Sequence, residues 1–280
     1  MTAVDETARV LLVEDLGSGF HRAVLHSPEI AGTAKPLQFV MVKVRAGIDP
    51  YLRRPFSLSL IDAQAGLIGL TWSVVGAGTE AMAAWEPGQT VSVLGPLGNG
   101  FDVAEVLAES HPRNEKDSPV FERRLFLLAG GTGLAPMFPL ATDAVGRGWQ
   151  VFLFYGARTA SALLDTAAFE SAGCRVLVST DDGSSGARGF VTDVAAKALP
   201  ACPGLGDVAV ACGPAPMLRA AKKLCRERGL TLYVSLEQRM ACGTGLCRGC
   251  AVKAGAEAES QYLHVCLDGP VFRADRVDLG

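Results

Sequence analysis

Four cysteines near the end of the chain are spaced as ligands of an iron-sulfur cluster. Cys242, Cys247 and Cys250 are separated by four and then two residues, and fifteen residues lie between Cys250 and Cys266. This C-x4-C-x2-C…C order is typical of [2Fe-2S] clusters, which need four thiolates around two irons. A four-cysteine zinc knuckle is the alternative, although it usually shows two short cysteine pairs. The spacing therefore predicts Cys242, Cys247, Cys250 and Cys266 as metal ligands of a [2Fe-2S] centre.

Two glycine turns, each after an apolar run of strand length, could bind the phosphates of a dinucleotide. LFLLAGGTGLAP ends its run at Gly130-Gly131-Thr132-Gly133, and DVAVACGPAPM ends its run at Cys212-Gly213-Pro214. One such turn alone is as easily a tight structural turn, because it lacks the full G-x-G-x-x-G pattern. Two turns at the carboxyl ends of strands in one sheet meet at the crevice where nucleotides bind. Together they predict dinucleotide binding.

A third set of residues could bind phosphate in the N-terminal part. Arg53 and Arg54 precede Pro55-Phe56-Ser57, and VVGAGT follows at residues 74–79. Arginine suits bidentate phosphate recognition, and the glycines and threonine of the second segment could offer amides and a hydroxyl. Spacing alone leaves a second interpretation open, namely a solvated arginine pair before an edge strand and a hairpin turn.

Composition and charge restrict the class of protein. The chain has 280 residues, 49% of them hydrophobic and 20% charged, which suits a globular protein of about two domains. The formal net charge of -3 offers no basic field for a phosphate backbone, so no nucleic-acid partner is expected. The uncharged stretch 125–142 contains glycines and prolines that suit a turn and a helix start, so no membrane span is expected. The acidic start has no secretory pattern, which predicts a cytoplasmic protein.

The order of apolar runs predicts three structured parts. Residues 1–105 give short alternating runs punctuated by Gly, Pro and Asp, which predicts an antiparallel β-barrel. A polar, proline-bearing linker is expected at 106–122. In 123–236, runs of strand length alternate with helical ones such as 161–173, which predicts a doubly wound parallel α/β sheet. Residues 237–280 are rich in Gly and Cys without periodicity. We expect a small [2Fe-2S] domain there, too short to fold without a stabilising metal centre.

The order of these motifs along nearly the whole chain resembles one known family. RRPFS, GAGT, GPLGNGF, AGGTGLAP, CGPAPM and ACGTGLCRGC follow one another as in the ferredoxin-reductase superfamily, and within it as in electron-transfer subunits of class B dihydroorotate dehydrogenases. The most specific pieces are VLGPLGNGF at 93–101, the MACGTGLCRGC loop and the short return in HVCLDGPVF. The resemblance implies a barrel that holds FAD, a domain that binds NAD and a C-terminal [2Fe-2S] domain.

The resemblance also implies which residues contact the nucleotides. Trp72 and Ser73 stand where relatives often have a Tyr-Arg pair, so the middle FAD contact departs from the family pattern. Cys212 would lie near the nicotinamide ring, while its second interpretation is a small buried apolar residue. The implied FAD residues are Arg54, Pro55, Phe56, Ser57, Thr71, Trp72, Ser73, Gly78 and Thr79, and the implied NAD residues are Gly130, Gly131, Thr132, Gly133, Cys212, Gly213, Pro214 and Met217.

The implied function is electron transfer in pyrimidine biosynthesis. Electrons would come from the FMN of a catalytic subunit that oxidises dihydroorotate and leave through [2Fe-2S] and FAD to NAD+, in a heterotetramer of two copies of each subunit. No catalytic acid-base residue is expected, because hydride transfer between flavin and nicotinamide depends chiefly on ring placement. Two alternatives stay open: an NAD(P)H-dependent reductase that feeds a ferredoxin or an oxygenase, and a zinc-stapled non-redox subunit. The sequence does not distinguish NAD from NADP, because Arg158 could bind the 2′-phosphate of NADP or simply be solvated.

Overall fold

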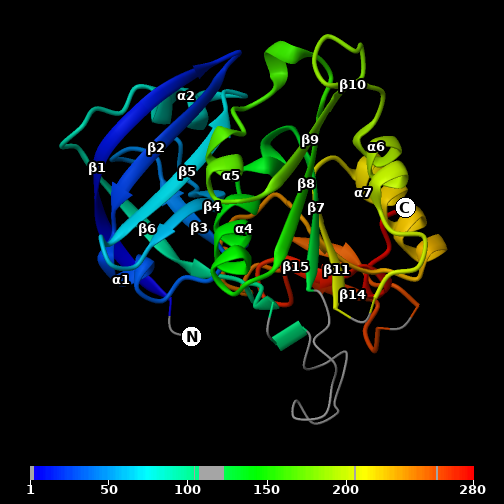
Figure 1. Ribbon diagram of the computed structural model, residues 1–280. Helices are drawn as coiled ribbons and strands as arrows, with labels where there is room; N and C mark the ends of the chain where they lie inside the picture. The colour runs from blue at the N-terminus through cyan, green and yellow to red at the C-terminus, as the bar shows by residue number, and fades with distance from the viewer. Residues whose placement is uncertain (1–2, 104, 107–122, 205, 257) are drawn as a thin grey trace. The chain divides into compact units, whose positions relative to one another are not determined.

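The described residues form two compact units. The computed structural model describes residues 3–103, 105–106, 123–204, 206–256 and 258–280 (Figure 1). One unit combines Met1–Phe101 with Leu236–Asp278, and the other combines Asp102–Ser235 with Leu279–Gly280. The cysteine-rich tail therefore belongs to the same compact unit as the N-terminal strands. The predicted linker at 106–122 lies outside the described residues except for its first residue, and the domain boundaries stay a prediction.

The N-terminal strands close into the predicted antiparallel barrel, with strand order β1-β2-β5-β4-β3-β6. In β1, buried Ala8 and Val10 alternate with exposed Thr7 and Arg9, which is the period of a half-buried strand. The inward residues make one apolar core that includes Leu58, Leu70 and Trp72. The elements of this part are β1 (Val4–Gly17), β2 (Phe20–His26), α1 (Pro28–Ala31), β3 (Phe39–Lys43), β4 (Arg54–Asp62), β5 (Leu67–Ser73), α2 (Ala77–Ala83) and β6 (Thr90–Leu97).

The second unit is the predicted doubly wound sheet. Its strands are parallel and lie in the order β10-β9-β8-β7-β11-β12, and helices α4 and α5 cover one face while α6 and α7 cover the other (Figure 1). Every residue of β11 is buried, as expected for a parallel strand covered on both faces. The elements are β7 (Arg124–Gly130), η1 (Gly131–Leu134), α4 (Met137–Gly146), β8 (Gln150–Ala157), η2 (Ala160–Ala162), α5 (Ala167–Ser171), β9 (Arg175–Thr180), β10 (Ala187–Arg188), α6 (Val191–Ala198), β11 (Asp207–Cys212), α7 (Ala215–Arg228) and β12 (Thr231–Ser235).

The tail has little regular structure, which agrees with its lack of sequence periodicity. A short antiparallel pair, β13 (Ala251–Lys253) and β14 (Tyr262–His264), separates the first three cysteines from Cys266. Strand β15 (Val271–Arg273) and the 3-10 turn η3 (Ala274–Arg276) follow. Among the helices of the described part of the chain, none is long and apolar enough to cross a bilayer.

Candidate functional site

The β13–β14 pair brings the two most distant predicted ligands together. Ala251 pairs with His264, and the amide of Val265 donates to the carbonyl of Cys250 at 3.1 Å. The sulfur atoms of Cys250 and Cys266 consequently lie 3.2 Å apart as free thiols. Cys242 and Cys247 form a second pair inside the loop, where the Cys247 amide donates to Cys242 Sγ at 3.3 Å. Two thiol pairs fit two irons with two thiolates each, as a [2Fe-2S] centre requires.

Backbone amides directed at the sulfurs favour thiolates in this loop. Thr244 N and Cys247 N donate to Cys242 Sγ at 3.4 and 3.3 Å, and Gly249 N donates to Cys247 Sγ at 3.4 Å. Burial alone would raise the pKa of Cys242, but these amide hydrogen bonds outweigh it and lower the pKa to about 6. Burial and the neighbouring Cys250 thiol raise the pKa of Cys266 to about 12. Cationic iron would stabilise both as thiolates, so the donor set suits the cluster.

The start of the cysteine loop lies directly on the barrel. Gly243 has φ +71°, and a Cβ at this position would lie 2.5 Å from Met41 Cγ and 3.2 Å from Leu97 Cδ1. Only glycine allows this approach, because any side chain would collide with the buried Met41. Sequence reasoning predicted the cysteines but missed Met41 and Leu97, whose only signal was the VLGPLGNGF motif that contains Leu97.

Arg54 and Gly78, two residues of the implied FAD site, come together at one end of the barrel. A Cβ on Gly78 would lie 3.0 Å from Arg54 Nε, so the guanidinium lies against the first turn of α2. The first N–H groups of a helix have no intrahelical partner and can donate to a ligand. The Thr79 hydroxyl is already used inside the loop, where it accepts from Val75 N at 2.9 Å and donates to Gly76 O at 2.9 Å. The arrangement therefore offers one arginine and backbone amides to a phosphate group.

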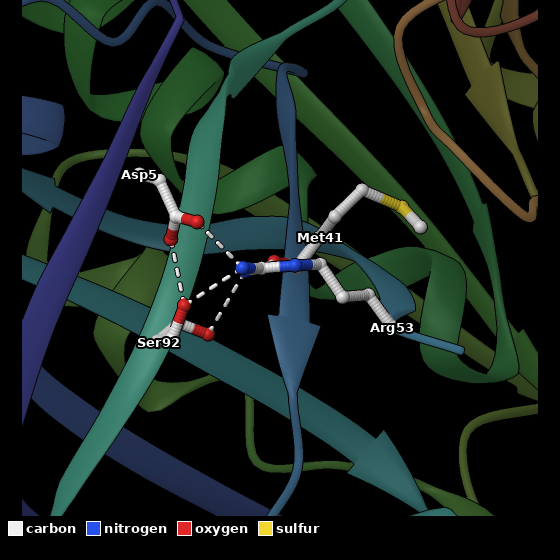
Figure 2. A network of polar contacts seen from close by, with 4 residues as sticks. All are labelled: Asp5, Met41, Arg53 and Ser92. Atoms are coloured by element: carbon white, nitrogen blue, oxygen red, sulfur yellow. Dashed lines mark hydrogen bonds and ion pairs between the residues drawn. The ribbon is translucent and has the colours of Figure 1, made fainter. Parts of the chain in front are cut away.

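The neighbouring Arg53 has a different environment. Its guanidinium donates to Asp5 Oδ2 at 2.7 Å, to Ser92 Oγ at 2.8 Å and to the carbonyls of Met41 and Ser92 at 3.3 Å (Figure 2). These partners come from three different barrel strands, β1, β3 and β6. Arg53 is therefore a structural cross-link of the barrel, and Arg54 is the arginine of the pair that lies beside Gly78.

The other implied FAD residues divide between the barrel interior and its surface. Trp72 is 2% exposed and packs against Phe56 and Trp85 with ring centroids 6.4 and 6.2 Å away. Its indole ring is thus part of the barrel core, which explains how the chain accommodates tryptophan here. Thr71 donates to Ser59 Oγ at 3.1 Å and is partly exposed, as are Pro55, Ser57 and Ser73. That Thr71, Trp72 and Ser73 contact FAD stays a prediction.

The two predicted nucleotide turns lie side by side in the second unit. Strands β7 and β11 are parallel neighbours, with Ala129 opposite Cys212. A Cβ on Gly133 would lie 2.3 Å from the Cys212 carbonyl oxygen, and one on Gly130 would lie 2.7 Å from Met217 Sδ and 2.9 Å from Pro214 Cδ. Glycine is required for this contact, which brings the two turns together at the carboxyl ends of neighbouring strands.

Cys212 is 1% exposed, as its interpretation as a packed residue predicts. Its contact with a nicotinamide ring stays a prediction. Cys174 and Cys225 are also buried, and burial raises their pKa values to about 11 and 12. These two thiols are therefore packed residues of the second unit.

Gly133→Ala should separate the two nucleotide turns. The added methyl group would collide with backbone, so we expect the free energy of unfolding to fall by about 1–3 kcal/mol and NADH binding to weaken. Gly146→Ala is the matched control, because a Cβ there meets no atom within 4 Å at the end of α4. Denaturant unfolding and NADH titration of both variants test this, and equal behaviour of the two alanines would contradict the close contact.

Comparisons with known proteins agree with this arrangement. The family described as the iron-sulfur cluster binding domain of dihydroorotate dehydrogenase B matches residues 237–278, and the oxidoreductase NAD-binding domain matches residues 127–223. A solved NADH-dependent reduced ferredoxin-NADP oxidoreductase, studied for flavin-based electron bifurcation, superposes with a TM-score of 0.80 at 28% identity over 98% of this chain and 90% of that chain. The iron-sulfur match favours the [2Fe-2S] interpretation over the zinc knuckle.

Relatives that match most of the chain belong to the family that the order of motifs resembles. Two proteins named "Dihydroorotate dehydrogenase B (NAD(+)), electron transfer subunit", from Geobacillus kaustophilus (strain HTA426) and Bacillus caldolyticus, are each 42% identical over 88% of this chain and 87% of their own length. The predicted fold class and the cofactor set of FAD, [2Fe-2S] and NAD are thereby confirmed. With its barrel, its nucleotide sheet and its four-cysteine tail, the chain belongs to the family of dihydroorotate dehydrogenase B (NAD(+)) electron transfer subunits.

Proposed function

We propose that this chain connects the FMN of a dihydroorotate-oxidising catalytic subunit to NAD+, with its own [2Fe-2S] and FAD groups between the two. The name of its relatives supports a partner subunit and NAD+ as the acceptor. When bound, the cluster supplies one-electron chemistry and FAD supplies the conversion to hydride transfer. We further propose a heterotetramer of two copies of each subunit and a cytoplasmic location.

We assign the FAD diphosphate to the Arg54 guanidinium and the first-turn amides of α2. Arg54 has the charge and the bidentate geometry for a phosphate, and Gly78 leaves it room beside the helix. Phe56 and Ser57, which follow on the same strand, would orient the isoalloxazine. We assign the NAD site to the two glycine turns at the ends of β7 and β11, where Gly130 and Gly133 permit the close contact with Cys212–Met217.

One observation carries the functional proposal, namely that the cysteine loop rests on the flavin barrel. Met41 contacts the position of Gly243 through its side chain, and its backbone lies opposite Pro55 of the RRPFS motif. A single strand residue thus separates the cluster loop from the implied flavin site. This proximity suits electron transfer between the two groups, because tunnelling weakens steeply with distance.

Mixing the purified chain with a dihydroorotate-oxidising catalytic subunit from the same organism tests the proposal. Alone, the chain should pass electrons from NADH to an artificial acceptor without oxidising dihydroorotate, since its described residues show no second flavin site. Adding the partner should produce dihydroorotate-dependent NADH formation, followed by near-ultraviolet absorbance. The rival function is a reductase that feeds a ferredoxin or an oxygenase. This rival rests on the likeness to the ferredoxin-NADP oxidoreductase at 28% identity, whereas relatives at 42% identity support the proposal. No gain of NADH formation on mixing would reject the proposal in favour of the rival.

A further inference from the structure

The VLGPLGNGF motif contacts both ends of the cluster-binding segment. Leu97 lies against Gly243, the residue that follows the first ligand Cys242. Asn99 contacts the other end, just beyond Cys266, where Nδ2 donates to the carbonyls of Val271 at 2.8 Å and Asp268 at 3.2 Å. The Asn99 Oδ1 atom accepts from Val271 N at 3.3 Å. The Asn99 side chain thus makes three hydrogen bonds to one short backbone segment.

The backbone around Asn99 reinforces this attachment. Its own amide donates to the Gly269 carbonyl at 2.7 Å. Gly98 has φ +79°, and a Cβ there would lie 2.4 Å from Pro270 Cδ, so the return segment touches the turn directly. Gln38 is 1% exposed and donates from Nε2 to the Gly98 carbonyl at 2.7 Å, which ties the turn to the barrel. The motif therefore makes a fixed platform rather than a loose loop.

The same motif is in register with the implied flavin residues. Leu97 lies opposite Phe39 in the β6–β3 ladder, and Phe39 lies opposite Ser57 in the β3–β4 ladder. One strand therefore separates Leu97 from the RRPFS motif. Because Leu97 and Asn99 hold the cluster-binding segment, they also fix the distance between that segment and the implied flavin residues.

We propose that Leu97 and Asn99 are positioning residues that hold both halves of the cluster-binding segment at a fixed spacing from the flavin site. This inference rests on the proposed FAD and [2Fe-2S] sites. Neither residue supplies a ligand to iron. Their role is to set the separation on which the rate of electron transfer between flavin and cluster depends.

Asn99→Ala and Asn99→Asp in the full chain with its cofactors test this role. Alanine removes all three side-chain hydrogen bonds, and aspartate keeps the acceptor for Val271 N but loses both donors. The matched control is Glu6→Ala, because the Glu6 carboxylate also accepts three hydrogen bonds, from Ser27 Oγ at 2.6 Å, Glu29 N at 3.3 Å and Ile30 N at 3.1 Å at the start of α1. Three quantities are measured: iron and flavin content, hydrogen exchange at Val271 N, and the rate at which the cluster is reduced after NADH reduces the flavin.

In both Asn99 variants we expect iron and flavin content to stay at the wild-type level. Exchange at Val271 N should accelerate in Asn99→Ala, which removes the acceptor of this amide. Flavin-to-cluster transfer should slow severalfold in both variants, because tunnelling weakens as the separation between the two groups grows. Glu6→Ala should leave exchange and transfer rate unchanged. If alanine prevents folding, the aspartate variant decides. A wild-type transfer rate in that variant would overturn the inference, whereas a wild-type chain without iron or flavin would overturn the proposed function instead.

Discussion

Cys250→Ser should remove the iron-sulfur cluster and leave FAD bound. Each iron needs two thiolates, and Cys250 is one of the buried pair whose sulfurs lie 3.2 Å apart. Retention of iron should fall by at least about a hundredfold, because losing a ligand costs more than the 10–100-fold typical of outer-shell partners. FAD should stay, since its implied residues are on the barrel strands and α2. Iron analysis, the visible spectrum and flavin content measure the two effects separately.

The same variant separates two electron-transfer activities. Dihydroorotate-dependent NAD+ reduction with the catalytic subunit should disappear, whereas NADH should still reduce an artificial acceptor through FAD. Cys202→Ser is the matched control, because Cys202 is an exposed free cysteine outside the four-cysteine set. It should leave iron content and both activities unchanged. Cys242→Ser, Cys247→Ser and Cys266→Ser should behave like Cys250→Ser, and normal iron stoichiometry in all four variants would reject the ligand assignment.

Arg54→Ala should weaken FAD binding by about ten- to a hundredfold. The variant loses a charge-assisted hydrogen bond to phosphate, which is worth about 1.5–3 kcal/mol. The guanidinium lies beside Gly78 and the first turn of α2, so its removal leaves only backbone amides to face the diphosphate. Flavin release measured by fluorescence against a dilution series gives the dissociation constant.

Arg53→Ala is the contrasting variant on the adjacent residue. It should lower the free energy of unfolding by about 1.5–3 kcal/mol through loss of the bonds to Asp5, Ser92 and Met41. Its effect on FAD affinity in the folded protein should be much smaller than that of Arg54→Ala. Equal losses of FAD affinity in the two variants, or no loss in either, would show that the phosphate site was assigned to the wrong arginine.

The sequence by itself determined the features that depend on local chemistry. The cysteine spacing predicted the ligand set, because cluster ligation needs thiolates at fixed intervals whatever surrounds them. Alternating and continuous apolar runs predicted a barrel and a doubly wound sheet, because each element must bury its own apolar face. The two glycine turns were predicted to meet, since the carboxyl ends of neighbouring parallel strands lie at one edge of a sheet.

Tertiary packing changed one local prediction. The run at 161–173 has helical character, yet the structure has a 3-10 turn at Ala160–Ala162 and a helix only at Ala167–Ser171. Between them the amide of Leu164 donates to the buried hydroxyl of Tyr155 at 2.9 Å. The Leu164 amide, which a continuous helix would bond within itself, is thus bonded to a side chain of strand β8. No local sequence pattern predicts that partner.

The contacts that join the cluster site to the barrel were likewise decided only by the tertiary structure. Arg53 and Arg54 are chemically identical neighbours, and their different environments follow from Asp5 and Ser92 on distant strands and from Gly78 on α2. The attachment of Asn99 to the segment after Cys266 spans about 170 residues of sequence, as the separation of 172 between Asn99 and Val271 shows. Residue type and spacing predict what a group can bind, whereas its partner across such a distance depends on how the whole chain packs.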